Sequence, residues 1–424
     1  MKYVFVGGRP STQLDYSYES IKLTNNLLIS MIDVLNSSNS HSKSFSFFKS
    51  LHEMNYVYRK TIKYNVFLDS GGYSIIVGDV KGSQTREFIE NYVKRILEGK
   101  LIYDYVFSLD IPVFLNEPNY NTIKHIYEFN KCSLTETYKH VKNDEILKNK
   151  IYFVWHFKIK EQYDIWSKLY DELKLNDYVV NYAAGGMVGL RGITQIDFSP
   201  FIAPMYRCLY EYINGNKNFD FRFHALGVYI QHDRFFLWFL EDLFKYYLQS
   251  EKVYVTYDSV NYMRTAQLRS RDLDIYHFNG KTIDIYKHIS CPTYIYESVY
   301  SNTHQLLLED INNIKYNNKM KDVGAFVPLN IYSNLQLDTF FKYIIDKYNI
   351  VDAFLSGNLI NVLATLGVAY PNVFTSQRIN SLKTNFRKTW KFHQWFIKSK
   401  QLDIFNELMY EFIKDINFPK VFHN

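Results

Sequence analysis

Short strand-like runs alternate with longer helical runs along most of this 424-residue chain. The strand-like runs are apolar, β-branched or aromatic, and lie at residues 3–6, 66–68, 103–109, 151–155, 178–182, 221–226 and 253–257. Apolar residues at helical spacing mark segments between them, as at 88–97 and 235–248. A strand followed by a helix, repeated this often within about 290 residues, favours a closed parallel sheet. The pattern predicts an α/β fold, a (β/α)8 TIM barrel.

The strand signals fade after about residue 300, and helical patterns replace them. Residues 339–348 and 408–416 carry apolar side chains at helical spacing. We therefore expect two parts, a barrel over residues 1–295 and a mostly helical, basic region over residues 296–424. The serine-rich run at 37–50 is predicted to be a surface loop or a frayed helix.

Composition and charge narrow the class of protein. The chain is 47% hydrophobic and 22% charged, which is typical of a globular protein with a large core. A formal net charge of +6 permits a nucleic-acid partner without requiring one. Three widely spaced cysteines offer no disulfide framework, and no apolar run suits a signal peptide or a membrane span. We expect a cytoplasmic protein that makes no membrane contact.

Polar residues and glycines follow the expected strands where each strand ends. In a barrel these positions gather at one end, which carries the chemistry in barrel enzymes. They are Asp69, Ser70, Gly71, Gly72, Tyr73, Asp110, His156, Gly185, Gly186, Leu226, Gly227 and Asp258. Glycine lets the backbone approach a flat ligand, and carboxylates act as nucleophile, general base or acceptor for N–H edges. Each position alone suits an ordinary turn or helix cap, but together they favour a site for a purine-like ring.

The same motifs, in the same order, resemble a known family. "DSGG" after a strand, then "LDIP", "GG-x-V", "H-x-x-G" and "YDSVNY" are similar to the motifs of the tRNA-guanine transglycosylase superfamily. The archaeosine-type branch is the closer match, because it typically shows "LDIPT" and "FDSAAYALYA" where this chain has "LDIPV" and "YDSVNYMRTA". The resemblance covers roughly residues 60–295 and lies in motifs rather than in continuous identity.

The resemblance implies a role for each matching residue. Asp258 falls at the family's nucleophile, Asp69 at its general base, and Asp110 at the acid that binds the N–H edge of the base. The backbone-rich ring slot corresponds to Ser70, Gly71, Gly72, Gly185 and Gly186, and Gly227 is a further candidate for substrate binding. Tyr73 and Leu226 fall where side chains cover the two faces of the ring, and His156 falls near a glutamine of the family.

The chain also departs from the family pattern. The family holds a structural zinc with a cysteine cluster and a later histidine, but here Cys291 has no partner cysteine nearby and Tyr294 occupies one ligand position. His288 and Cys291 are too few for a tetrahedral zinc site, so we expect no zinc and no cofactor. The tRNA-docking C-terminal modules of the family have no obvious counterpart.

These departures point to the DpdA-like 7-deazaguanine DNA transglycosylases of phages and bacterial gene clusters. The resemblance then implies a pentosyltransferase that exchanges guanine in DNA for a free 7-deazaguanine base, preQ0 or a derivative. The alternatives are the same chemistry on tRNA, a non-catalytic nucleic-acid-binding subunit, and an unrelated barrel hydrolase that uses the carboxylates as acid and base.

Two basic clusters are candidates for phosphate contact. Arg264, Arg269 and Arg271 follow the expected nucleophile directly. The second cluster, in 375–400, contains Lys383, Arg387, Lys388 and Lys391, interleaved with Trp390, Phe392, Trp395 and Phe396. Cations with aromatic side chains between them are typical of nucleic-acid binding, in which the rings stack on bases. A solvated helix whose aromatic side packs on the barrel explains this second pattern equally well.

Overall fold

The computed structural model describes twelve stretches of the chain, and the account below concerns these residues alone. They are residues 2–6, 17–31, 40–71, 86–111, 120–156, 160–185, 198–215, 217–228, 230–259, 274–287, 290–300 and 326–414.

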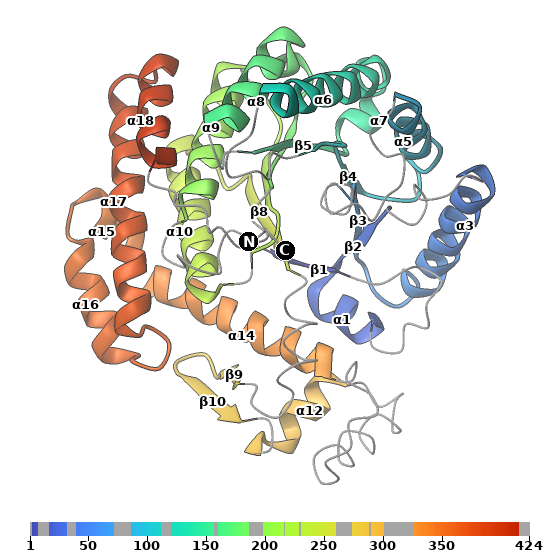
Figure 1. Cartoon of the computed structure of the whole chain (residues 1–424). Coiled ribbons are helices and arrows are strands. Elements are labelled where there is room, and N and C mark those ends of the chain that lie inside the picture. Colours follow the sequence, from blue (N-terminus) through green and yellow to red (C-terminus); the bar gives the residue numbers. More distant parts are fainter. Residues whose placement is uncertain are drawn as a thin grey trace.

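Eight parallel strands form a closed barrel, each paired with the next in chain order (Figure 1). They are β1 (Lys2–Val6), β2 (Asn26–Ser30), β3 (Asn65–Asp69), β4 (Tyr105–Phe107), β5 (Ile151–Trp155), β6 (Asn181–Ala184), β7 (Phe221–Ala225) and β8 (Val253–Asp258). Strand β8 closes the barrel on β1, with Tyr3 opposite Tyr257 and Val4 opposite Asp258. The expected (β/α)8 TIM barrel is confirmed.

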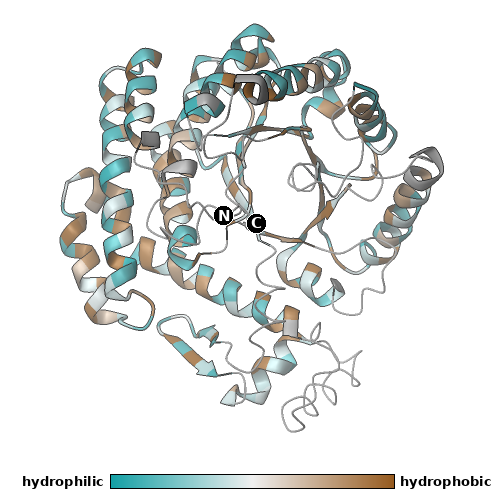
Figure 2. Cartoon of the chain, viewed as in Figure 1, coloured by the Kyte–Doolittle hydropathy of each residue, from teal (hydrophilic) through white to brown (hydrophobic). Residues whose placement is uncertain are grey.

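Helices surround the strands and cover their outer faces (Figure 1). They are α1 (Ser17–Thr24), α3 (Ser40–Tyr58), α5 (Arg86–Glu98), α6 (Tyr120–Val141), α7 (Glu145–Lys148), α8 (Lys160–Glu172), the short 3₁₀ helix η1 (Leu175–Asp177), α9 (Ser199–Asn214) and α10 (Gln231–Leu248). Figure 2 shows the strands mostly in the hydrophobic colour, with hydrophilic residues frequent on the surrounding helices. This distribution is expected when both faces of a parallel sheet are buried.

Buried apolar side chains form two separate clusters, one inside the barrel and one outside its strands. A small cluster inside the strands contains Val4, Leu28, Phe67, Phe107, Tyr152, Val154 and Ala183. A much larger cluster lies between the strands and the helices, and continues without a break into the C-terminal helices. The interior of the barrel is therefore a packed core that supports the residues above it.

The C-terminal region contains an antiparallel hairpin and a set of helices. The elements are β9 (Asp274–Phe278), β10 (Ile283–Lys287), α12 (Thr293–Val299), α14 (Phe326–Lys347), α15 (Ile350–Leu355), α16 (Leu359–Ala369), α17 (Ser376–Lys398) and α18 (Leu402–Lys414). Helix α14 contacts α1, α10 and β9, while α17 and α18 pack on α9 (Figure 1). The expected helical C-terminal region is confirmed, whereas the boundary at residue 295 stays a prediction.

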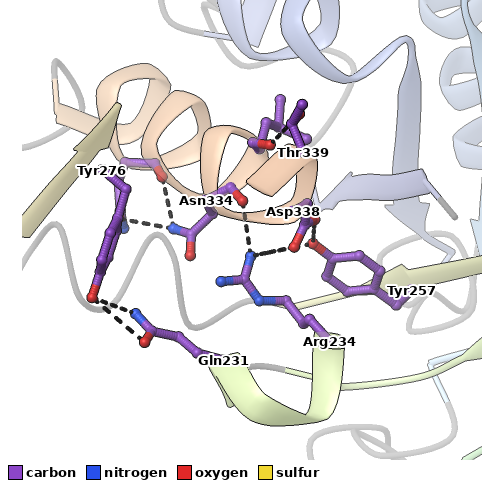
Figure 3. A network of polar contacts seen from close by, with 9 residues as sticks. Gln231, Arg234, Tyr257, Tyr276, Asn334, Asp338 and Thr339 are labelled. Atoms are coloured by element: carbon purple, nitrogen blue, oxygen red, sulfur yellow. Dashed lines mark hydrogen bonds and ion pairs between the residues drawn. The ribbon is translucent and has the colours of Figure 1, made fainter. Parts of the chain in front are cut away.

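A buried polar network joins α14 to the strand that ends at Asp258 (Figure 3). Arg234 of α10 places its Nη1 3.1 Å from Asp338 Oδ1 and donates to the backbone oxygen of Asn334 at 3.1 Å. The hydroxyl of Tyr257, the residue before Asp258, donates to the other oxygen of Asp338. Arg234 and Asp338 are both buried. Their ion pair lies where α14 of the C-terminal region meets the barrel.

Strands β2 and β6 differ from the sequence predictions. Strand β2 is absent from the expected set, and β6 begins at Asn181 rather than at 178, because Tyr178 follows η1 and stacks on Tyr138 with ring centroids 4.2 Å apart. The serine-rich run enters helix α3 at Ser40. No helix among the described residues has the length and apolar character needed to cross a membrane.

Candidate functional site

The polar residues expected to form a site lie at the carboxyl ends of the barrel strands. Side chains two residues apart on a strand face the same side of the sheet. Asp69 is two residues beyond the interior side chain of Phe67, and His156 and Gly185 stand in the same relation to Val154 and Ala183. The alternation therefore directs these positions toward the barrel axis, above the packed interior.

Asp69 ends β3 and lies close to two other carboxylates. Burial, followed by the negative charges of Asp258 and then Asp110, raises the pKa of Asp69 to about 7. Hydrogen bonds from the backbone N–H groups of Gly71 and Ser70 act in the opposite direction. The effect of both charges on Asp69 shows that Asp69, Asp110 and Asp258 come together at one end of the barrel, as the sequence predicted.

Gly71 allows the chain to turn sharply after β3. Its φ of 74° lies in the left-handed region, where a side chain would be strained. The turn directs the N–H of Gly71 back to the Asp69 carboxylate, and Ser70 is buried beside it. The glycine at 71 is thus explained by backbone conformation.

Asp110 follows β4 and is held by side chains of α6. The amide of Asn130 binds both backbone groups of Ile111, accepting from its N–H at 2.9 Å and donating to its carbonyl at 3.0 Å. The hydroxyl of Ser133 donates to the carbonyl of Leu109 at 2.7 Å. The residues on both sides of Asp110 are therefore fixed by a helix rather than by neighbouring strands, and its carboxylate stays buried at the strand end.

His156 pairs with Asp110 at the end of β5. Its Nε2 contacts Asp110 Oδ2, and its ring lies 5.5 Å from that of Trp166. The side chain is only 2% exposed, and its Nδ1 has no hydrogen-bond partner among the described residues. The imidazole thus keeps one polar atom for a ligand beside the carboxylate.

Gly185 lies beside His156 and leaves room there. A Cβ at this position would stand 3.0 Å from His156 Cε1, 3.2 Å from Val154 Cγ1 and 3.3 Å from Leu226 Cδ1. These contacts are tighter than ordinary van der Waals packing, so any side chain at 185 would displace its neighbours. The strand pairing continues through this residue, because the Gly185 N–H donates to the carbonyl of Trp155 at 2.9 Å.

The turn after β7 supports Asp258. Gly227 has a φ of 78°, and its N–H donates to Asp258 Oδ1 at 2.9 Å. The N–H of Val228 donates to the Asp258 backbone carbonyl at 2.8 Å. These hydrogen bonds connect the turn to Asp258, which is 8% exposed.

One residue in contact with the site was not among the predicted site residues. His224, in the middle of β7, is fully buried, and its Nε2 lies 3.2 Å from Asp258 Oδ1. It opens the "H-x-x-G" motif, and it lies two residues before Leu226, so strand alternation points it inward. That alternation was the available signal, but it was not applied to a residue in the middle of a strand.

Several predicted positions lie outside the described residues. They are Gly72, Tyr73, Gly186, Arg264, Arg269 and Arg271. Their expected roles in ring binding and phosphate contact stay predictions.

The basic helix α17 turns its aromatic side inward. Phe392, Trp395 and Phe396 are buried against α9, α10 and α18, while Trp390 is half-buried against Phe354. The alternative with aromatic packing is therefore the one observed, and base stacking by these buried rings is excluded.

The cations of α17 have different surroundings. Arg387 is exposed, Lys383 and Lys388 are half-buried, and Lys391 is exposed and paired with Glu411. Phosphate contact by this helix stays a prediction that depends on charge alone.

Few metal-binding side chains lie close together in the part of the chain that the structure describes. No group of three or more His, Cys, Asp or Glu side chains there could hold a metal ion. Cys291 is buried, Tyr294 is half-exposed, and His288 lies outside the described residues.

Comparisons with known proteins do not assign this chain to a family. No protein-family model matches the chain, and no curated protein matches its sequence. Conclusions about chemistry therefore depend on the geometry described above and on the motif resemblance.

Proposed function

We propose that this protein is a transglycosylase that exchanges guanine in DNA for a free 7-deazaguanine base, through a covalent aspartyl–glycosyl intermediate. One observation carries the proposal. The carboxylate at the nucleophile position, Asp258, lies close enough to Asp69 for its charge to raise the pKa of that residue, which reaches about 7. A group with this pKa can both donate and accept a proton near neutral pH.

In the first displacement, Asp258 attacks C1′ of a deoxyguanosine that has left the base stack. The new bond joins a carboxylate oxygen to C1′, and the bond from C1′ to N9 breaks. Asp69 in its protonated form gives a proton to the departing guanine. The products are the free base, a glycosyl ester on Asp258 and an ionised Asp69.

In the second displacement, the incoming 7-deazaguanine gives its N9 proton to the ionised Asp69. The base then attacks C1′ and the ester bond to Asp258 breaks. Asp69 is again protonated and Asp258 is again a carboxylate, so the enzyme returns to its starting state. Two displacements retain the configuration at C1′, and the kinetics are expected to be ping-pong.

Asp110 and His156 supply recognition rather than chemistry. A guanine-like ring presents N–H groups on one edge, which an ionised carboxylate accepts. His156 Nδ1 has no hydrogen-bond partner among the described residues, and the backbone of Gly185 lies close to that ring without a side chain between them. This arrangement suits a flat heterocycle better than a sugar chain, which weighs against a glycoside hydrolase.

The proposal that the substrate is DNA rather than tRNA comes from the sequence. A direct assay tests it. Purified protein is incubated with guanine-containing DNA or with tRNA, each with radiolabelled preQ0 or guanine, and label in the polymer is counted. Label in DNA alone is the expected result. Label in tRNA alone overturns the substrate assignment and keeps the mechanism. Label in neither polymer, with DNA still bound, overturns the enzyme assignment in favour of a nucleic-acid-binding subunit.

Substitution of Gly185 tests where the base binds. We expect Gly185→Ala to weaken binding of free guanine or preQ0 about tenfold or more, because the added methyl crowds His156 and Leu226 and overpacking of this kind costs about 1–3 kcal/mol. Calorimetric titration with each base measures the change.

The matched control is Gly367→Ala in α16, where the nearest atom to a new Cβ is 3.6 Å away. This variant should bind as the wild type does. Unchanged affinity in Gly185→Ala would show that the ring binds elsewhere.

A further inference from the structure

His224 is a fully buried imidazole inside the barrel. Aromatic rings surround it, with centroids 4.9 Å away for Phe107, 5.8 Å for Phe67 and 6.2 Å for Tyr152. An imidazole in such surroundings loses its water and needs partners for both ring nitrogens. An aromatic side chain without nitrogen would fill the same space without that requirement.

Both nitrogens of His224 find a partner on the neighbouring strand β8. Nδ1 lies 2.7 Å from Thr256 Oγ1, and Nε2 lies 3.2 Å from Asp258 Oδ1. Thr256 and Asp258 are two residues apart and face inward together, opposite His224 in the parallel register. The imidazole thus connects the hydroxyl and the carboxylate of one strand face.

The partners determine the tautomer of a neutral His224. An ionised Asp258 can only accept, so Nε2 must carry the proton. Nδ1 is then an acceptor, and the Thr256 hydroxyl must donate to it. Thr256 also interacts with the Tyr152 hydroxyl, which can donate in turn. The polar side-chain atoms of His224, Thr256 and Tyr152 then have compatible partners.

The two oxygens of Asp258 are not equivalent in this arrangement. Oδ1 receives Nε2–H of His224 at 3.2 Å and the backbone N–H of Gly227 at 2.9 Å. Both of these donors bind Oδ1, and no hydrogen bond to Oδ2 is found among the residues that the structure describes. An oxygen with two donors has less freedom and less electron density for attack than one without donors.

We propose that His224 is a positioning residue that fixes Asp258 Oδ1 and thereby assigns Oδ2 as the attacking oxygen. The inference rests on the proposed function. In the first displacement Oδ2 forms the bond to C1′ and Oδ1 becomes the carbonyl oxygen of the ester. In the second displacement the ester bond to Oδ2 breaks and its electron pair returns to the carboxylate. The two donors at Oδ1 then stabilise the carboxylate that is released.

This assignment predicts a kinetic signature that loose packing would not produce. Without Nε2–H the carboxylate is a poorer leaving group, so the glycosyl-enzyme breaks down more slowly and accumulates. Binding of free base involves Asp69, Asp110 and His156, and should not change. A general loss of structure would instead weaken base binding and lower the amount of intermediate.

The experiment compares His224→Phe with His224→Gln. Phenylalanine suits the aromatic surroundings but has no donor, whereas a glutamine amide can donate to Asp258 and accept from Thr256. We expect His224→Phe to lower the exchange rate about ten- to a hundredfold, with an unchanged dissociation constant for the free base and more trapped glycosyl-enzyme. His224→Gln should recover most of the rate. Equal rates in the two variants, or a wild-type rate in His224→Phe, would overturn the inference.

A second measurement does not depend on activity. Selective ¹⁵N-histidine labelling, with the His224 signals assigned through His224→Phe, reports the tautomer in the wild type. A proton on Nε2 is expected. A proton on Nδ1 alone would overturn the inference even if exchange occurs. If wild-type protein transfers label to neither DNA nor tRNA, the proposed function fails, and the tautomer still decides the hydrogen bond to Asp258.

Discussion

Replacement of Asp258 by asparagine is expected to end base exchange, with a loss on the order of 10⁴-fold or more. The amide oxygen can still accept from Gly227 and His224, so the end of β8 keeps its hydrogen bonds. The amide is a poor nucleophile, however, and forms no stable bond to C1′. The measurement is denaturing electrophoresis of protein mixed with guanine-containing DNA and no incoming base, in which only the wild type should retain DNA.

The control for this substitution is Asp274→Asn on β9. Asp274 is exposed and its ion pair with Lys287, at 2.7 Å, lies outside the barrel. This variant loses the same charge and should exchange bases at the wild-type rate. Free guanine should also bind to Asp258→Asn with near wild-type affinity. Exchange that persists in Asp258→Asn would show that another group is the nucleophile.

Replacement of Asp69 by asparagine is expected to lower exchange about 10²- to 10⁴-fold, because both half-reactions need its proton. In the wild type, guanine release requires the protonated acid and should slow as pH rises through about 7. Transfer to the incoming base requires the carboxylate and should accelerate over the same interval. Measurement of each half-reaction between pH 5 and 9, by release and by uptake of labelled base, separates the two limbs.

The same substitution should stabilise the protein at alkaline pH. Since the pKa of Asp69 rises from 3.8 to about 7 on folding, the folded chain binds more protons than the unfolded chain between these values. Stability therefore falls as pH rises through that window. Asparagine does not ionise, so Asp69→Asn should gain about 2 kcal/mol at pH 8, roughly half the full effect because Asp69 is partly exposed, and almost nothing at pH 4.

Thermal or urea unfolding at both pH values measures this difference, with Asp274→Asn as the reference. Equal gains at pH 4 and pH 8 would contradict a raised pKa of Asp69. If Asp69→Asn loses activity but the two wild-type half-reactions do not change in opposite directions with pH, Asp69 is not a proton shuttle. It would then be a binding residue.

The sequence was sufficient for the fold class and for the end of the barrel that carries the site. Asp69, Asp110, His156, Gly185 and Asp258 come at or directly after strand ends, and the parallel barrel brings them together. Strand-end positions are predictable because they depend only on recognising runs of apolar residues and the polar residue that follows.

Other elements could not be found in this way for local reasons. Strand β2 follows α1 after a single residue, Asn25, whose φ of 55° makes the turn without glycine or proline. The hairpin β9–β10 did have a signal, since Asn279 and Gly280 form its turn, with Gly280 at a φ of 94°. The hairpin follows the last barrel strand and is not part of the repeated strand–helix pattern.

Contacts between distant residues were also beyond the sequence. Asn130 and Ser133 hold the backbone beside Asp110 from 19 or more positions away, and nothing in their local pattern distinguishes them from other polar residues of a helix. The aromatic side of α17 illustrates the same limit, because alternating cations and rings fit a nucleic-acid surface and a buried helix equally well until the packing partners are known.

The contact between Tyr257 and Asp338 sets a lower limit on the length of a functional fragment. A protein shortened to residues 1–295 would lack Asp338 and Asn334, and the buried guanidinium of Arg234 would lose both of these partners. Loss of these partners from a buried cation is expected to be destabilising. The part of the chain beyond 295 therefore supports the end of β8, and a ligand that shifts α14 would move Tyr257, the residue next to Asp258.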